Sequence, residues 1–247
     1  MLDLVFTGIG SAFCPQLGNT SAFFWKGDRL YLLDCGSLVF AALENNSILA
    51  QAKDIFILLT HTHADHSGSL GTLISYCKHV RTIPVSVVHP ESDIKNLLRY
   101  NGIKNKQYSL YSGMRHSDEY VSVEFFPVPH TKSLNAYGMT VSDPEETIYY
   151  SGDAGDVPAD VWQGFIKGRI ARIYQDVSLT GKMGGSHADF HWFVSNCPEE
   201  CRKRFYPIHM DASCKQQAEQ HGFGQAVLLC PSAGEAVASA GKHDVKP

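Results

Sequence analysis

The densest group of potential metal-binding side chains lies in the stretch LLTHTHADHSGSL, between residues 58 and 70. It contains His61, His63, Asp65 and His66. Imidazole nitrogens and carboxylate oxygens are the donors that zinc and similar divalent ions accept. Such side chains directly after an apolar run are costly to place beside a core unless their polarity is compensated. The stretch therefore predicts a metal site rather than ordinary packing.

Three more chelating side chains follow other predicted strands. His130 comes after FFPVP, Asp153 after TIYYSG and His209 after RFYPI. Side chains at strand ends can converge on one crevice while the sheet holds their backbone still. These seven donors are too many for one tetrahedral ion, but they suit two ions that share a bridging carboxylate. We assign His61, His63 and His130 to the first ion. We assign Asp65, His66 and His209 to the second ion. Asp153 would bridge the two.

The donor types predict two Zn²⁺ ions, with Mn²⁺ or another divalent ion as the alternative. Asp34 ends the predicted strand YLLD. We expect its carboxylate to accept the ring N–H of a metal-binding histidine and to fix the orientation of that ring.

The elements that must position these donors indicate a mixed-sheet α/β fold. SAFFW and RLYLLDCG predict a hairpin that turns at Gly27 and Asp28, and AYGMTVSD and TIYYSGD predict another that turns at PEE. DIFILLT is a short apolar run, as expected of a strand buried on both faces. Helical segments alternate with strands later in the chain, and QAVLLC is the last strand we expect.

Length and composition indicate an ordinary globular chain. We expect a single domain over residues 1–247 with a loose tail from about residue 232, whose residues are small and polar. No stretch approaches the roughly 20 apolar residues that cross a bilayer, and the first residues carry no basic segment typical of a secretory signal. We therefore expect a cytoplasmic protein whose 7 cysteines are reduced, including Cys197 and Cys201. The net charge of −4 disfavours long nucleic acids as partners.

The donor pattern resembles that of the metallo-β-lactamase fold superfamily. The motif His-x-His-x-Asp-His with later His, Asp and His is joined by LLDCG and YSGDAGD, which are similar to the flanking motifs of that superfamily. The resemblance spans residues 2 to about 230. It implies a four-layer αββα sandwich of two mixed β-sheets, with the metals at one edge between the sheets.

Within the superfamily the chain resembles the ribonuclease Z-like phosphodiesterases. The opening FTGIGSAF followed by GNTSAFF, and the later GGSHADFHWF, are similar to that branch. Ribonuclease Z enzymes often carry a long basic arm that clasps tRNA, whereas the interval between His130 and Asp153 is only long enough for a hairpin. In length, motif spacing and the missing arm, the chain is similar to the phage anti-Pycsar phosphodiesterases. That resemblance implies hydrolysis of cyclic CMP, cyclic UMP and other cyclic mononucleotides, which counters a bacterial defence signal.

The same resemblance implies roles for individual residues. His187 occupies the position at which ribonuclease Z places a histidine for proton transfer, with His191 as a rival. Asp65 would hold and orient the nucleophile, while two ions activate water for in-line attack on phosphorus. The product would be a linear nucleoside monophosphate.

Several alternatives remain open at this stage. A tRNA 3′-processing endonuclease and a hydrolase of another small ester are competing enzyme functions, and a metal-stabilised interaction module is the non-enzymatic one. Tyr111, Tyr137 and Trp192 are candidates for stacking on a base. The polar, tyrosine-rich insert YNGIKNKQYSLYSGMRHSDEY, residues 100–120, could be a lid or an arm of a homodimer that reaches the neighbouring active site.

Overall fold

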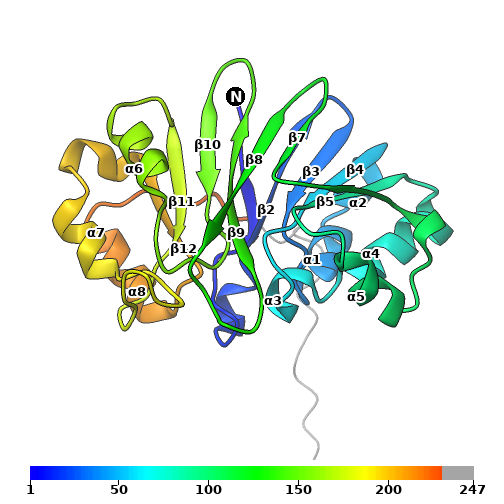
Figure 1. Ribbon diagram of the computed structural model, residues 1–247, viewed down its shortest axis with the longest axis horizontal. Coiled ribbons are helices and arrows are strands. Elements are labelled where there is room, and N and C mark those ends of the chain that lie inside the picture. The colour runs from blue at the N-terminus through cyan, green and yellow to red at the C-terminus, as the bar shows by residue number, and fades with distance from the viewer. Residues whose placement is uncertain (230–247) are drawn as a thin grey trace, which may run out of the picture.

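The computed structural model describes residues 1–229, and two β-sheets lie face to face at its centre with helices on both outer sides (Figure 1). This arrangement confirms the predicted four-layer αββα sandwich. The tail that we expected from about residue 232 lies outside the described residues.

The first sheet has the strand order β1-β2-β3-β4-β5-β6. β1, β2 and β3 pair antiparallel, while β3, β4, β5 and β6 pair parallel, so the sheet is mixed as predicted. Its strands are β1 (Val5–Gly8), β2 (Ser21–Lys26), β3 (Arg29–Leu33), β4 (Asp54–Leu58), β5 (Val85–His89) and β6 (Ser109–Ser112).

The second sheet has the order β12-β11-β10-β9-β8-β7 and is also mixed. β7 to β10 pair antiparallel, and β10, β11 and β12 pair parallel. The predicted hairpin is formed by β9 and β10, and its turn is closed by the Asp143 N–H, which donates to the Glu146 carbonyl at 2.9 Å. The strands are β7 (Arg115–Ser117), β8 (Ser122–Val128), β9 (Ala136–Ser142), β10 (Thr147–Tyr150), β11 (Arg172–Asp176) and β12 (Phe205–Ile208).

Each sheet has its own set of helices, as Figure 1 shows. Those beside the first sheet are α1 (Val39–Asn45), α2 (Ile48–Gln51), α3 (Ala64–Ser67), α4 (Leu70–Tyr76) and α5 (Ile94–Tyr100). Those beside the second sheet are α6 (Ala159–Ile166), α7 (Phe190–Asn196) and α8 (Ala212–Gln220). The short 3₁₀ and π segments are η1 (Pro15–Leu17), η2 (Cys77–Arg81), η3 (Asn105–Gln107) and η4 (Glu199–Arg204).

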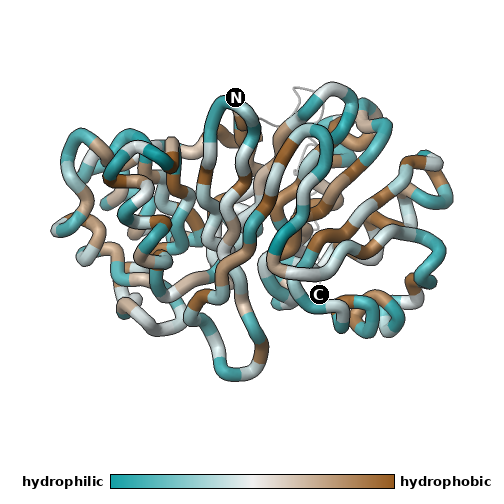
Figure 2. Tube along the Cα trace, turned by 45° about the horizontal axis from the view of Figure 1, so that its top comes forward, coloured by the Kyte–Doolittle hydropathy of each residue, from teal (hydrophilic) through white to brown (hydrophobic). Residues whose placement is uncertain are grey.

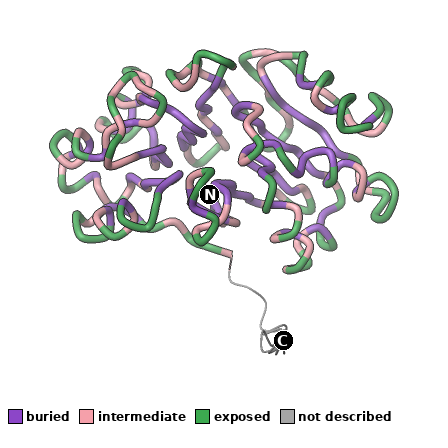
Figure 3. Tube along the Cα trace, turned by 90° about the horizontal axis from the view of Figure 1, so that it is seen from below, coloured by how far each residue is buried: buried purple, intermediate pink, exposed green. Residues whose placement is uncertain are grey.

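Alternation along the strands builds two hydrophobic layers. In β3, Tyr31 and Leu33 belong to the cluster shared with the second sheet, whereas Leu30 and Leu32 belong to the cluster packed against α1, α4 and α5. Hydrophobic stretches follow the strands in Figure 2, and Figure 3 shows buried backbone in the interior with exposed loops around it. The sheets are therefore held rigidly from both faces, which fixes the positions of the loops at their ends.

The prediction of a strand at QAVLLC is wrong. Within the described residues this segment makes only an isolated parallel bridge between Phe6 and Leu228. The Phe6 N–H donates to the Val227 carbonyl, and the Leu229 N–H donates to the Phe6 carbonyl, both at 2.8 Å. β1 is short and its pairing register shifts between Phe6 and Gly8, so its free edge offers no longer run of partners.

The insert of residues 100–120 is built into the sheets. Its η3 turn leads to β6 at the edge of the first sheet and then to β7 at the edge of the second. Tyr111 stacks on Phe56 with ring centroids 6.1 Å apart. This packing disagrees with a free lid over the chain's own site, because the segment is part of both sheet edges.

No helix among residues 1–229 is long and apolar enough to cross a membrane. The described cysteines are all buried and free. Cys197 and Cys201 pack in the hydrophobic cluster between the second sheet and its helices.

Candidate metal centre

The seven predicted donors lie together at one end of the two sheets. His61 and His63 follow β4, and His130, Asp153 and His209 follow β8, β10 and β12. Asp65 and His66 lie in α3. Their donor atoms form two groups, each within 4.8 Å: His61, His63, His130 and Asp153; and Asp65, His66, His209 and Asp153. These groups match the two sets assigned from the sequence, with Asp153 common to both.

A close backbone contact fixes the loop that carries the second group. The Cys35 N–H donates to the His66 carbonyl at 2.7 Å, and the Ser37 N–H donates to the Ala64 carbonyl at 3.1 Å. Between them, a Cβ added at Gly36 would lie 1.8 Å from the Asp65 carbonyl oxygen. Only glycine permits this approach, so the loop after β3 and helix α3 are locked together.

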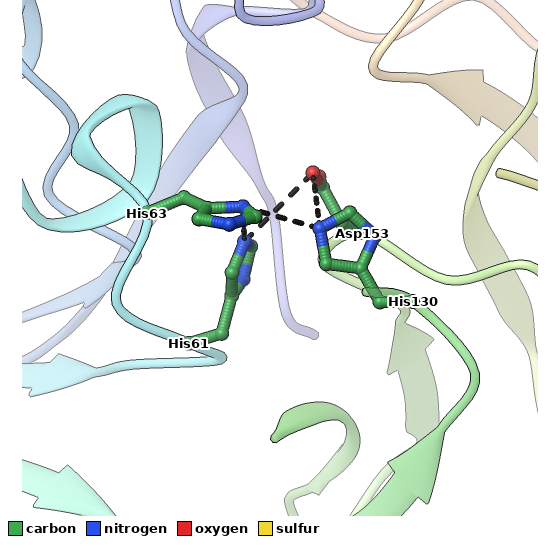
Figure 4. A group of neighbouring side chains, drawn as sticks. All are labelled: His61, His63, His130 and Asp153. Atoms are coloured by element: carbon green, nitrogen blue, oxygen red, sulfur yellow. Dashed lines mark hydrogen bonds and ion pairs between the residues drawn. The ribbon is translucent and has the colours of Figure 1, made fainter. Parts of the chain in front are cut away.

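The first donor set is a cluster of imidazoles around one carboxylate (Figure 4). His63 Nδ1 lies 3.2 Å from His61 Nε2 and 3.1 Å from His130 Nε2. Asp153 Oδ2 lies 3.8 Å from His61 Nε2 and 3.6 Å from His130 Nε2. Four donor atoms thus face a common point.

Neighbouring acceptors decide which nitrogen each imidazole presents. The Ser186 carbonyl can only accept, so His130 Nδ1, 2.9 Å away, must donate and Nε2 is left with its lone pair. His61 Nδ1 lies 3.0 Å from the Thr60 hydroxyl, which leaves His61 Nε2 toward the cluster. Metal-binding histidines commonly have their second ring nitrogen held in this way.

The second donor set meets the other carboxylate oxygen of Asp153. His66 Nε2 lies 2.8 Å and His209 Nε2 lies 3.2 Å from Asp153 Oδ1. Asp65 Oδ2 lies 3.3 Å from His209 Nε2. His66 Nε2 and Asp153 Oδ1 are buried without a hydrogen bond of acceptable geometry. Buried polar atoms normally make well-directed hydrogen bonds, so two metal-ligand atoms that meet as an ion pair without that geometry fit residues arranged for a cation.

Asp34 supports this set as predicted. Its Oδ2 accepts from His66 Nδ1 at 2.8 Å and from the Tyr150 hydroxyl at 3.2 Å, while Oδ1 accepts the Thr60 N–H at 2.8 Å. Asp34 is fully buried and has a left-handed backbone with φ 63°. A non-glycine residue held in this conformation is typical of a functional site, where the surroundings compensate for the strain.

The buried charges of the cluster support one another. Burial opposes charge on His66, but Asp153 and Asp34 together outweigh it and raise the pKa of His66. Burial likewise opposes ionisation of Asp153, yet His209 and His66 hold its pKa well below the usual range. His61 differs, because burial and the nearby charge of His66 lower its pKa.

His187, the predicted proton donor, lies beside both donor sets. Its ring is 5.3 Å from that of His130 and stacks 5.1 Å from that of His209. Asp176, fully buried at the end of β11, accepts from His187 Nδ1 at 2.7 Å. Burial lowers the pKa of His187, but its hydrogen bond and charge interaction with Asp176 raise it overall. The rival His191 is exposed on α7 and does not line the cavity described next.

Five of the seven donors line a cavity of about 840 Å³: His63, Asp65, His130, Asp153 and His209. The lining is mostly hydroxyl-bearing and apolar, with one further carboxylate; beyond the donors it consists of Ser11, Ala12, Phe13, Pro15, Asn19, Ser37, Leu38, Ala64, Thr131, Val177, Ser178, Ser186, His187 and Asp211. No lysine or arginine is among the described residues that line it. The volume lies within the range of about 300–1,000 Å³ typical of small-molecule sites.

The proposed stacking residues do not line this cavity. The Tyr137 hydroxyl donates to Glu91 at 2.9 Å, and Trp192 packs against Trp162 with ring centroids 5.5 Å apart. Tyr111 lies on β6 at the outer edge of the first sheet.

The family of the chain follows from comparison with known proteins. Residues 2–228 match the model of the family described as Anti-Pycsar protein Apyc1. The chain belongs to the Anti-Pycsar protein Apyc1 family. One relative, the Anti-Pycsar protein Apyc1 of Bacillus phage 010DV004, is 28% identical over 237 residues, which cover 84% of this chain and 88% of that protein.

Solved structures support the fold of this Apyc1 family member. The metallo-β-lactamase fold protein YhfI from Bacillus subtilis is 14% identical with a TM-score of 0.68, and the match covers 92% of this chain and 96% of that one. The short form of human tRNase Z is 17% identical with a TM-score of 0.64, covering 90% and 95%. The chain therefore has the metallo-β-lactamase fold, and its two donor sets carry the imidazole and carboxylate groups that divalent ions accept.

Asp176, Thr60 and Phe13 are functional candidates that sequence reasoning missed in this Apyc1 family member. Asp176 ends β11 just as Asp34 follows β3, so a carboxylate at a strand end was the available signal. Thr60 precedes His61 and could have been considered as its support. Nothing in the sequence singles out Phe13, because its exposure at the cavity is a property of the fold.

Proposed function

We propose that this Apyc1 family member hydrolyses 3′,5′-cyclic mononucleotides, cyclic CMP and cyclic UMP first among them, to linear nucleoside monophosphates. The curated relatives are named anti-Pycsar proteins, and we extend that role to this chain: removal of a bacterial cyclic-nucleotide defence signal in the host cytoplasm. The observation that carries the proposal is a small cavity that ends on two donor sets sharing Asp153.

The shape and charge of the cavity favour a small phosphodiester over RNA. A protein that grips a nucleic-acid backbone does so with Lys and Arg, and none is among the described residues of the cavity lining. The β9–β10 hairpin occupies the interval in which a long basic arm would stand, between His130 and Asp153. A single phosphate with one nucleoside fits the cavity without such contacts.

Two divalent ions, Zn²⁺ by preference, would be held by the two donor sets. His61, His63 and His130 would hold the first with Asp153, and Asp65, His66 and His209 would hold the second with Asp153. When bound, the ions would lower the pKa of a coordinated water and neutralise charge on the phosphate.

The chain's own residues would supply positioning and proton transfer. Asp176 fixes the His187 ring through Nδ1 and favours its charged form, which leaves Nε2 for the substrate. His187 would then protonate the sugar oxygen that leaves phosphorus, a contribution of about 10²–10⁴-fold in rate. Asp65, half-buried beside His209, would orient the attacking oxygen.

We further propose a homodimer through the outer edges of the two sheets. β6 and β7 are edge strands, and Tyr111, Met114 and Tyr120 beside them are 44%, 40% and 39% exposed. Edge strands with exposed apolar side chains are ready partners for another chain. In such a dimer the insert of residues 100–120 could reach the neighbouring active site, and light scattering of the purified protein at several concentrations tests the assembly.

The function is tested by incubating the zinc-loaded protein separately with cyclic CMP, cyclic UMP, cyclic AMP, cyclic GMP and a precursor tRNA. We expect nucleoside monophosphates from the cyclic nucleotides and intact tRNA. Cleavage of the tRNA alone would overturn the proposal in favour of a tRNA 3′-processing endonuclease. Turnover of neither class, with both metal sites filled, would point to another small ester.

A further inference from the structure

Two large apolar side chains stand exposed at the rim of the catalytic cavity. Phe13 is 96% exposed and Leu38 is 46% exposed, and both line the cavity that five of the donors also line. Exposed apolar side chains are common on protein surfaces, but a pair at the mouth of a polar cavity is a contact surface for a ligand.

The turn that carries Phe13 is held rigidly. The Cys14 N–H donates to the Ser11 carbonyl at 3.0 Å, which places Phe13 at the tip of a tight turn. The Ser11 N–H in turn donates to the Met210 carbonyl at 3.0 Å, next to the donor His209. The exposure of Phe13 is therefore a fixed feature of the site.

Close packing beneath the same loop gives it little freedom. A Cβ added at Gly10 would lie 2.6 Å from the Gly18 carbonyl oxygen and 2.7 Å from that of Cys14. The Gly10 N–H also donates to the Gly18 carbonyl at 3.0 Å. Gly10 and Gly18, at the two ends of the loop that carries Phe13, are therefore held in contact with each other.

Leu38 is tied to the Phe13 loop. Asn19, which is 8% exposed, bridges to Gly10 in the backbone, and its Oδ1 accepts the Leu38 N–H at 2.9 Å. The Ser37 hydroxyl fixes the same segment by donating to the Ala64 carbonyl at 2.9 Å. The backbone segments that carry Phe13 and Leu38 are therefore tied to each other and to the loop that carries Asp65.

We propose that Phe13 and Leu38 form the nucleobase subsite, in which the base of the cyclic nucleotide stacks on the Phe13 ring with Leu38 as the second apolar contact. This inference rests on the proposed function, and it assigns the phosphate, the ribose and the base to different parts of the cavity. The donors take the phosphate, the hydroxyl side chains of the wall face the ribose, and the rim takes the planar, weakly polar base. Aromatic stacking accepts every base, so the subsite serves pyrimidine and purine cyclic nucleotides alike.

The test compares cyclic nucleotides with a probe that has no base, methyl riboside 3′,5′-cyclic phosphate. Loss of one base-stacking contact corresponds to roughly 5- to 150-fold. We expect Phe13→Ala to raise KM for cyclic CMP by that factor with kcat nearly unchanged, and to leave KM for the base-free probe unchanged. Phe13→Trp keeps the stacking surface and should retain the wild-type KM, whereas Phe13→Leu should resemble Phe13→Ala.

A matched control is Tyr100→Ala, which removes an aromatic side chain that is 78% exposed and lies away from the cavity. This variant should leave kcat and KM unchanged for both cyclic CMP and the base-free probe. Equal KM effects of Phe13→Ala on cyclic CMP and on the base-free probe, or no effect on either, would overturn the subsite.

A binding measurement separates failure of the subsite from failure of the proposed function. Titration of the Phe13→Trp variant with CMP should quench tryptophan fluorescence, and titration with ribose 5-phosphate should not. Quenching by CMP without turnover of any cyclic nucleotide by the wild type would overturn the proposed reaction and retain the subsite. Turnover by the wild type with no quenching by CMP would overturn the subsite alone.

Discussion

The two donor sets share Asp153 but differ in how they are held. In the first, the second ring nitrogens of His130 and His61 lie against neutral groups, the Ser186 carbonyl and the Thr60 hydroxyl respectively. In the second, His66 and His209 are buried and face two buried carboxylates, Asp34 and Asp176. Charged acceptors hold an imidazole more firmly than neutral ones. We therefore expect the second set to hold its ion more firmly than the first.

The largest effect is expected from the residue common to both sets. Asp153→Asn should reduce bound metal at both sites and reduce turnover to background, because it removes the shared negative charge. Metal analysis after gel filtration and cyclic CMP hydrolysis measure the two losses. Asp156→Asn is the matched control, since Asp156 accepts the Val157 N–H and belongs to neither set. Retention of both ions by Asp153→Asn would contradict the bridging role.

The next effect concerns proton transfer beside the two sets. His187→Gln should lower kcat by about 10²–10⁴-fold while both ions stay bound, because His187 belongs to neither assigned donor set. His191→Gln should leave kcat unchanged, since His191 is exposed outside the cavity. Steady-state kinetics and metal analysis of the two variants decide between them. Loss of metal from His187→Gln would instead make His187 a ligand.

A smaller loss of metal affinity is expected at only one of the two donor sets when Asp34 is changed. Asp34→Asn leaves His66 Nδ1 with a neutral neighbour and should weaken binding of the second ion by about 10–100-fold. Competitive titration with a zinc chelator measures the two affinities. Asp118→Asn is the control, because this mostly buried carboxylate accepts from Tyr31 far from the donors. An equal loss at both sites would break the distinction drawn here.

The smallest effect tests the neutral support of the first set. Thr60→Val removes a hydroxyl that lies 3.0 Å from His61 Nδ1 and also donates to Asp34 at 2.9 Å. Because the hydrogen bond to His61 joins neutral groups and is worth roughly 0.5–1.5 kcal/mol, the variant should weaken binding of the first ion by no more than about tenfold. The same chelator titration applies. A larger loss than that from Asp34→Asn would reverse the ranking of the two sets.

The convergence of the seven side chains was predictable from sequence because five of them follow strands and the other two lie in the short helix directly after β4, while strand ends of a packed sheet meet at one edge. Their supports were less visible. Asp176 lies in a strand whose sequence, RIYQD, is ordinary, and only the fold turns its carboxylate to His187. Tyr137 and Trp192 were chosen by closeness in sequence to the motifs. Strand alternation and the face of α7 direct both side chains elsewhere.

The segment QAVLLC shows a second limit. Its composition predicts a strand, but a strand also needs a partner edge of matching length. β1 provides only a short, irregular edge, and this information lies in another part of the chain.

The contact between Gly36 and Asp65 has a practical consequence for redesign. Position 36 accepts no side chain, yet Ser37 and Leu38 directly after it line the cavity. A library that seeks a new substrate preference should therefore randomise Phe13 and Leu38 and leave Gly36 untouched. Such variants would keep the loop that holds Asp65 and His66 in place and would change only the residues proposed to contact the base.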